Sequence, residues 1–194
     1  MSEHPEVLIG VTAGIAAYKA CTLVSRLVQS GVGVTVMMTR EATQLVAPRT
    51  FQSLSGRGVL VEMYPALASD SLARESEAGL AHPHIESSRW ADLLAVVPAT
   101  ANILGKAANG IADDLLSTTL LAFDGPMLFA PAMNAIMWKN KAVQRNVAQL
   151  REDGHLFVGP AEGHLACGET GAGRMAEPEE IFDAIMAELK RLKG

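Results

Sequence analysis

The feature that most constrains the fold is a series of short apolar runs separated by segments with helical spacing. The runs occupy residues 7–11, 34–38, 93–97, 127–130 and 155–158, with a weaker candidate at 58–61. Helical patterns stand between or after them at about 15–29, 101–108, 113–121, 141–152 and 178–192. Strands that are apolar on both faces are typical of a parallel sheet covered by helices on both sides. The alternation therefore predicts an α/β fold, a three-layer doubly wound parallel sheet of the Rossmann-like or flavodoxin-like kind.

Length, charge and cysteine content narrow the class of protein. The 194 residues suffice for one sizeable domain, expected to span 1–194. The net charge is −5 and no basic block is present, which argues against nucleic acid as a partner. No apolar run approaches membrane-spanning length, and the N-terminus lacks the pattern of a signal peptide. Cys21 and Cys167 do not make a disulfide framework, so we expect a reducing, cytoplasmic location.

Most of the unusual sequence follows the predicted strands. In a doubly wound sheet, ligands bind beyond the carboxyl ends of the strands. Pro98 is expected to end its strand, and residues 65–83 form the longest irregular segment. The predicted ligand-binding edge comprises residues 12–15, 39–40, 98–102, 131–134 and the glycine-rich segment 163–175.

The first of these segments admits two interpretations. Gly10 and Gly14 could cradle a phosphate at a helix N-terminus, or could simply allow a tight turn. A dinucleotide site would also require an acidic residue after the second strand, where this chain has Thr39 and Arg40. Ordinary NAD is thereby disfavoured, while a mononucleotide or a 2′-phosphorylated cofactor stays open.

Polar side chains at the other strand ends could cap helices or bind a ligand. Thr100 or Asn102 could be an N-cap, or could bind phosphate or a polar ring edge. Asp113 or Asp114 is expected to cap the next helix. Asn134 could cap a short turn, or its amide could donate to a substrate carboxylate.

The glycine-rich segment carries a thiol. Gly163, Gly168, Gly171 and Gly173 flank Cys167, and so many glycines disfavour a helix or strand interior. We therefore expect a mobile loop that closes over a substrate, the alternative being a flexible surface turn. His82 and His84 precede the third strong strand, but neither has metal-ligand spacing to a cysteine or an acid, so no metal is expected.

Taken together, the ordered motifs resemble the homo-oligomeric, flavin-dependent cysteine decarboxylase family over most of the chain. The matching pieces are Gly14-Ile-Ala-Ala-Tyr-Lys19, Thr50-Phe-Gln-Ser-Leu-Ser-Gly56, His84-Ile with Trp90-Ala-Asp92, Pro98-Ala-Thr-Ala-Asn102, Asp113-Asp-Leu-Leu-Ser-Thr118, Ala130-Pro-Ala-Met-Asn134, and Ala166-Cys-Gly-Glu169 through Gly173-Arg-Met175.

This resemblance implies FMN as the cofactor and trimers, or dodecamers built from trimers, with the flavin near subunit boundaries. It implies His84 as the catalytic histidine, Asn134 as the holder of the substrate carboxylate and Cys167 as a proton donor on a flap. Met133 and Arg174 would join Asn134 in binding the substrate. The implied flavin-binding residues are Ala13, Gly14, Ile15, Thr39, Thr100, Ala101, Asn102, Ile103 and, near the ring, Ala132.

The implied reaction is the decarboxylation of 4′-phosphopantothenoylcysteine to 4′-phosphopantetheine in coenzyme A biosynthesis. Oxidation of the substrate thiol to a thioaldehyde would place the carboxylate β to a C=S carbon, which accepts the electrons that CO₂ leaves behind. The flavin would accept the hydride and later return it to the enethiolate, His84 would assist proton movement, and Cys167 would supply the proton in the final reduction. The alternatives are an enethiol-forming peptidyl-cysteine decarboxylase and a non-catalytic, flavin-binding regulatory relative.

Several questions stay open at the level of sequence. The partner of the substrate phosphate could be Arg174, Lys106 or Arg89. Many bacterial members carry a C-terminal ligase domain, so this chain could be a stand-alone enzyme or one domain of a bifunctional protein. The choice between trimer and dodecamer, and the role of residues 65–83, are also undecided.

Overall fold

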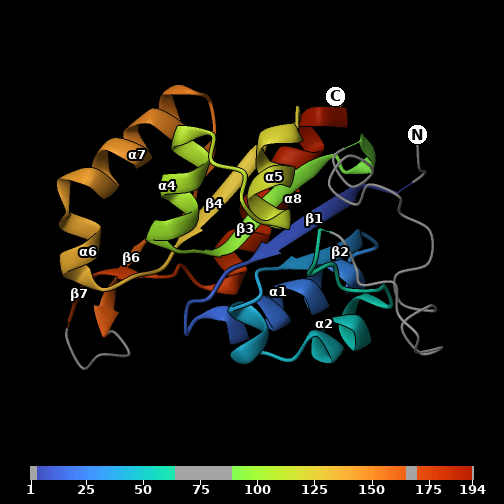
Figure 1. Cartoon of the computed structure of the whole chain (residues 1–194). Helices are drawn as coiled ribbons and strands as arrows, with labels where there is room; N and C mark the ends of the chain where they lie inside the picture. Colours follow the sequence, from blue (N-terminus) through green and yellow to red (C-terminus); the bar gives the residue numbers. More distant parts are fainter. Residues whose placement is uncertain (1–3, 64–88, 165–169, 194) are drawn as a thin grey trace.

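The computed structural model describes residues 4–63, 89–164 and 170–193, so the predictions for His84 and Cys167 lie outside the described residues. A parallel sheet crosses the molecule (Figure 1) with the strand order β2-β1-β3-β4-β5. This is the flavodoxin-like order, and it confirms the predicted doubly wound α/β class. The strands are β1 (Glu6–Val11), β2 (Gly33–Met38), β3 (Leu93–Ala99), β4 (Met127–Pro131) and β5 (Leu156–Phe157).

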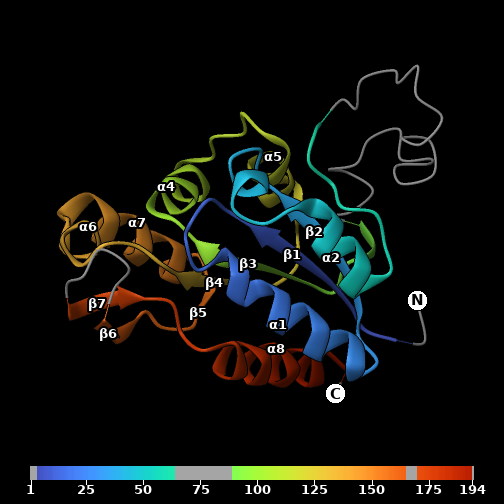
Figure 2. The same ribbon diagram turned by 90° about the horizontal axis from the view of Figure 1, so that it is seen from below.

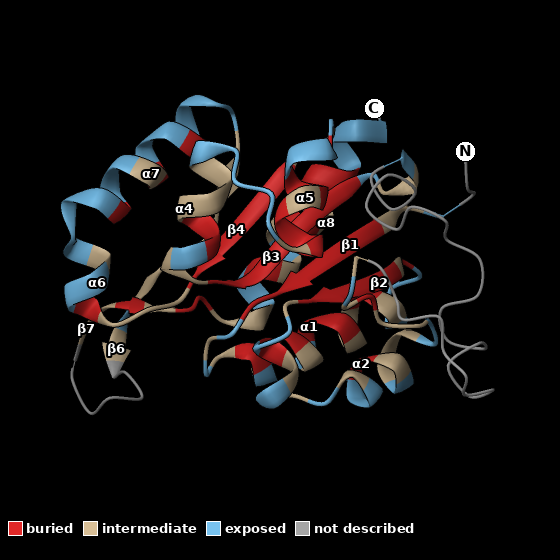
Figure 3. Ribbon diagram, viewed as in Figure 1, coloured by how far each residue is buried: buried red, intermediate tan, exposed pale blue. Residues whose placement is uncertain are grey.

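Helices cover both faces of the sheet, as Figure 2 shows from below. Side chains that alternate along a strand enter opposite cores: Val7 and Ile9 pack with one set of helices, and Leu8 packs with the other. Figure 3 shows the central strands β1, β3 and β4 as the most continuously buried part of the molecule. The first face carries α1 (Ala17–Gln29), α2 (Pro48–Ser55) and α8 (Pro178–Lys193); the second carries α4 (Ala101–Asn109), α5 (Leu115–Ala122) and α7 (Lys141–Glu152).

Local signals account for several helix ends. Gly31 follows α1 with a φ of +79°, a conformation that glycine adopts without a Cβ clash. Asp114 caps α5, accepting a hydrogen bond from the Ser117 amide at 2.8 Å, as the sequence predicted for one of the two acids. Two short helical segments, η1 (Ala42–Gln44) and α6 (Ala135–Lys139), follow β2 and β4.

Two strand predictions are wrong in detail. Pro98 does not end its strand: β3 continues to Ala99, and its pairing with β4 shifts register between Val96 and Ala99. A proline lacks the N–H of a regular ladder but is accommodated at such an irregularity. The candidate strand at 58–61 is reduced to one bridge between Leu60 and Met37. There the Leu60 amide donates to Val36 O, and the Met38 amide donates to Leu60 O.

The glycine-rich segment also differs from its prediction. Its described parts are not a loop but belong to an antiparallel pair, β6 (Ala161–His164) with β7 (Thr170–Arg174). The pair lies beside α6 at one end of the molecule (Figure 1). The glycines permit a close approach of backbones: a Cβ on Gly173 would lie 2.3 Å from Met133 O. The glycine content therefore reflects tight packing here rather than an irregular backbone.

Candidate functional site

A cleft of about 610 Å³ opens at the carboxyl edge of the sheet, where the chain order reverses between β1 and β3. Ligands of doubly wound proteins bind at this position, and the volume suits a small molecule. The β1–α1 loop, the β3–α4 turn, the β4–α6 turn and the end of β7 form its walls. Its lining residues are Ala13, Gly14, Ile15, Ala16, Tyr18, Lys19, Thr100, Ala101, Ala132, Met133, Asn134, Met137, Gly173, Arg174 and Met175.

A buried hydroxyl group joins two of these walls. Thr12 is 2% exposed, and its Oγ1 donates to Pro98 O at 2.7 Å and accepts from the Thr100 amide at 3.3 Å. Gly14 brings the same loop close to the β3–α4 turn, because a Cβ on Gly14 would lie 3.3 Å from Pro98 Cγ. The Thr12 hydroxyl and this close approach thus join the β1–α1 loop to the β3–α4 turn.

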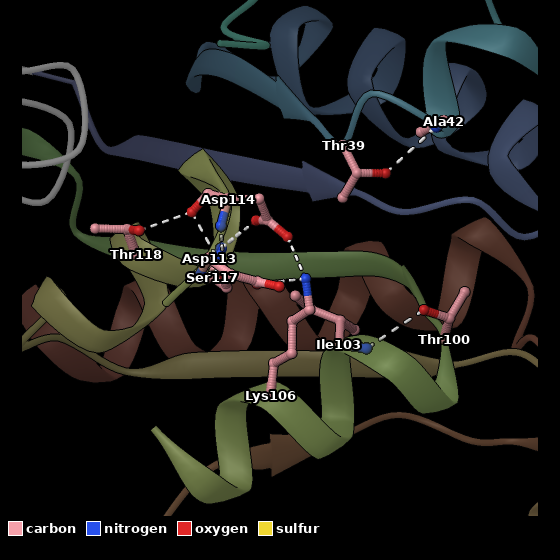
Figure 4. Close-up of polar contacts among 9 residues, drawn as sticks. All are labelled: Thr39, Ala42, Thr100, Ile103, Lys106, Asp113, Asp114, Ser117 and Thr118. Atoms are coloured by element: carbon pink, nitrogen blue, oxygen red, sulfur yellow. Dashed lines mark hydrogen bonds and ion pairs between the residues drawn. The ribbon is translucent and has the colours of Figure 1, made fainter. Parts of the chain in front are cut away.

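Helix N-termini surround the cleft. Thr100 is the N-cap of α4 (Figure 4), its Oγ1 accepting from the Ile103 amide at 3.5 Å. Asn134 caps α6 through Oδ1, which accepts from the Ile136 amide at 2.7 Å. Among the described residues, no side chain caps α1. The N-terminus of α1 faces the cleft, and the positive end of its helix dipole favours anions there, although the Ala17 and Lys19 amides already donate to Gly14 O and Ala16 O.

Cationic side chains stand at one side of the cleft. Lys19 Nζ donates to Glu177 at 2.9 and 3.1 Å, and Arg174 pairs with the same carboxylate. Hydrogen bonding to Lys19, together with the charges of both cations, holds the pKa of the Glu177 carboxyl below its usual range. Glu177 is therefore ionised at neutral pH and links α1 to the chain just after β7.

The structure brings many of the expected site residues together. Nine of them line the cleft: Ala13, Gly14, Ile15, Thr100, Ala101, Ala132, Met133, Asn134 and Arg174. Asn134 serves as a helix cap and also lines the cleft, so the two interpretations of this residue are compatible.

Other expected residues do not line the cleft. Thr39 follows the end of β2, and its Oγ1 accepts from the Ala42 amide at 3.3 Å (Figure 4). Ile103 is buried in the core and Asn102 is exposed. Gly10, the first glycine of the proposed phosphate cradle, lies inside β1 against Leu116 rather than in the loop. His84 and Cys167 lie outside the described residues.

Sequence reasoning missed some lining residues as candidates, among them Tyr18, Lys19 and Met137. Tyr18 and Lys19 fall within a matching family motif, but helical spacing alone gave no reason to assign them to a ligand. Their position on the first turns of α1, facing the cleft, depends on how α1 packs against the sheet.

Two basic residues that the sequence offered as partners of the substrate phosphate lie outside the cleft. Lys106 Nζ pairs with Asp113 and Asp114 at 2.6 Å each, between α4 and α5 (Figure 4). Arg89 borders a different cavity, beside Glu6 and Asp92 at the amino ends of β1 and β3.

Within residues 4–63, 89–164 and 170–193, no group of three metal-ligating His, Cys, Asp or Glu side chains is found. None of the described helices is long and apolar enough to cross a bilayer.

Comparisons with known proteins agree with this architecture. The profile of the family described as Flavoprotein matches residues 1–190. The coenzyme A biosynthesis bifunctional protein CoaBC of Bacillus subtilis is 49% identical over 181 residues, which cover 93% of this chain and 42% of that protein. The chain thus spans less than half the length of this relative.

Solved structures show the same fold. The FMN-dependent cysteine decarboxylase SpaF superposes with a TM-score of 0.78 at 34% identity, over 98% of each chain. A cysteine-to-serine mutant of PPC decarboxylase complexed with pantothenoylaminoethenethiol gives a TM-score of 0.79 at 30% identity, over 97% of this chain and 100% of the other.

Proposed function

The chain belongs to the Flavoprotein family, and we propose that it is the FMN-dependent enzyme that decarboxylates 4′-phosphopantothenoylcysteine to 4′-phosphopantetheine in coenzyme A biosynthesis. The observation that carries the proposal is the convergence of three strand-end segments and Arg174 on one cleft. The relative from Bacillus subtilis supports the pathway, and the PPC decarboxylase complex supports the type of substrate. We also propose that residues 1–194 form a single decarboxylase domain.

The cleft fits a flavin mononucleotide. Small side chains at Ala13, Gly14, Ala101 and Ala132 leave room for a flat ring, and Met133 adds an apolar surface. The positive N-terminal end of α1 and the Thr100 turn would receive the phosphate and the polar edge. FMN bound here would supply the two-electron acceptor that converts the substrate thiol to a thioaldehyde.

The residues of the chain would bind the substrate and move protons around it. Asn134 stands on the β4–α6 turn with its side chain at the cleft, and we assign it to the substrate carboxylate. His84 is assigned to proton transfer near neutral pH, where imidazole titrates. Cys167 is assigned to donate the proton that completes the saturated product, as the resemblance to the cysteine decarboxylases implies.

The assembly is proposed to be a homotrimer, or a dodecamer built from trimers, in the cytoplasm. Large apolar side chains are exposed around the cleft: Ile15 by 64%, Tyr18 by 61% and Ile136 by 72%. A patch of this kind is typical of a surface that another chain covers. A second copy placed here would close the open side of the flavin site.

The test is mass spectrometry of the product formed from 4′-phosphopantothenoylcysteine by the FMN-loaded protein. We expect the wild-type chain to release CO₂ and form 4′-phosphopantetheine. The Cys167→Ser variant should still release CO₂ but accumulate the enethiol, because the final proton donor is missing. Removal of FMN should abolish both products, and reconstitution should restore them.

Each alternative has a distinct outcome in the same experiment. Enethiol as the end product of the wild-type chain would identify an enethiol-forming decarboxylase instead. Flavin binding without CO₂ release would identify a non-catalytic flavin binder. Normal phosphopantetheine yield from Cys167→Ser would refute the role given to that thiol.

A further inference from the structure

Among the described residues, the charged side chains that line the cleft are all positive. Lys19 and Arg174 are the charged residues in its lining, and every other lining side chain is neutral. Lys19 projects from α1, and Arg174 ends β7. Two cations from distant parts of the chain therefore meet at one side of an otherwise uncharged cleft.

Their shared counter-ion does not balance them. Glu177 is the carboxylate that pairs with both cations, and it does not line the cleft. One negative charge set against two positive ones leaves the cluster with a net positive charge facing the cleft. A partly buried positive charge favours an anionic ligand.

The guanidinium group is also incompletely satisfied. Arg174 Nε is buried, and within the described part of the chain it has no hydrogen-bond partner. Its neighbour Nη2 is directed to Glu177. A buried N–H group without a partner is unfavourable, so a small adjustment that brings this group to a ligand oxygen would be favourable.

We infer that Lys19 and Arg174 together bind the phosphate group of the substrate, an inference that rests on the proposed function. A guanidinium group matches two phosphate oxygens with its planar fork, and a lysine ammonium adds a point charge. The side chain of Lys19 is 17% exposed, so its charge is only partly screened by solvent.

The scissile carboxylate is the less suitable ligand for this pair. Negative charge leaves that carboxylate as CO₂ departs, so two cations bound to it would stabilise the ground state more than the transition state. The phosphate does not change its charge during the reaction. Tight binding of the phosphate therefore positions the substrate without opposing the chemical step.

The experiment compares 4′-phosphopantothenoylcysteine with unphosphorylated pantothenoylcysteine in steady-state decarboxylation. Lys19→Gln and Arg174→Gln should each raise KM for the phosphorylated substrate by about 10- to 100-fold, the loss expected for a charge-assisted hydrogen bond. KM for the unphosphorylated substrate should change little. Arg174→Lys should recover part of the loss, because it restores the charge without the fork.

Two further variants separate phosphate binding from a structural role. Arg26 pairs with Glu179 and so joins α1 to the start of α8, as Lys19 does through Glu177, but it lies outside the cleft lining. Arg26→Gln should leave the preference for the phosphorylated substrate unchanged. Glu177→Gln keeps both cations and removes their competitor, so it should preserve or increase that preference. If Lys19 and Glu177 served only to hold α1 to the start of α8, Glu177→Gln would instead impair decarboxylation as severely as Lys19→Gln.

The remaining outcomes overturn the inference. Equal loss with both substrates in Lys19→Gln and Arg174→Gln would show that the pair does not recognise the phosphate. Weakened FMN binding, measured by flavin fluorescence, with unchanged substrate preference would assign the pair to the flavin phosphate. Absence of turnover by the wild-type chain would overturn the proposed function and this inference together, whereas turnover with unaltered preference overturns the inference alone.

Discussion

Thr12 illustrates how one side chain can hold two parts of the site together. Its hydroxyl group donates to Pro98 O at 2.7 Å and accepts from the Thr100 amide at 3.3 Å. Thr12→Val keeps the shape but leaves both backbone groups without this partner. We expect the free energy of unfolding to fall by about 1–3 kcal/mol, measured by urea denaturation of the apoprotein. FMN affinity, measured by fluorescence, should fall as well, because the two walls lose their connection.

Two control variants define the Thr12 prediction. Thr12→Ser retains the hydroxyl and should behave like the wild-type chain. Thr119→Val removes another buried hydroxyl, which donates to Leu115 O within α5 at 2.8 Å and is remote from the cleft. It should leave FMN affinity unchanged. If Thr119→Val and Thr12→Val weakened FMN binding equally, the connecting role of Thr12 would be refuted.

At the scale of elements, the backbones of β7 and the β4–α6 turn lie in close contact beside the site. The Met133 amide donates to Gly173 O at 2.9 Å, and Gly173 has a φ of +140°. Gly173→Ala would place a methyl carbon 2.3 Å from Met133 O. We expect a loss of about 1–3 kcal/mol in the free energy of unfolding, together with a lower kcat/KM, because Asn134 and Arg174 flank this contact.

The matched control for this element is Gly105→Ala in α4. A Cβ at Gly105 would lie 3.5 Å from Asn146 Nδ2, an ordinary contact. An alanine inside a helix stabilises it relative to glycine, so the free energy of unfolding should rise by about 0.5–1 kcal/mol. Equal effects from both substitutions would show that the β7 contact is not specifically constrained.

At the scale of the whole molecule, the exposed apolar side chains around the cleft predict an interface between copies of the chain. Ile136 is 72% exposed on α6, and Ile136→Asp would introduce a charge into that interface. We expect light scattering to show a trimer or a larger assembly for the wild-type chain and a smaller species for the variant. Bound FMN should decrease in parallel, because the open side of the cleft is no longer covered.

Leu192 provides the control for this interface. It is 43% exposed near the end of α8 and borders the cavity at the opposite edge of the sheet. Leu192→Asp should leave the assembly intact. A monomeric wild-type chain, or dissociation caused only by Leu192→Asp, would contradict the proposed interface.

Much of the fold could be predicted because its signals are local. The apolar strands and the helices between them follow from side-chain periodicity, and Asp114 acts as a cap through the amide of Ser117 only three residues away. The predictions that failed depend on partners distant in sequence. Pro98 stays in β3 because its pairing with β4 changes register there, and the glycines of β7 fit a strand packed closely against the β4–α6 turn and the start of α6, Gly173 against Met133 and Gly171 against Ala135.

For the site, the sequence by itself determined the strand-end segments and the family motifs that they carry, since these depend on neighbouring residues. Only the tertiary structure decided that these segments share one cleft, through the strand order β2-β1-β3-β4-β5. It also decided that Lys19 and Arg174 meet across Glu177, while Lys106 is held by Asp113 and Asp114. The physical reason is that local preferences act over a few residues, whereas the pairing of distant charges follows from how whole elements pack around the buried sheet.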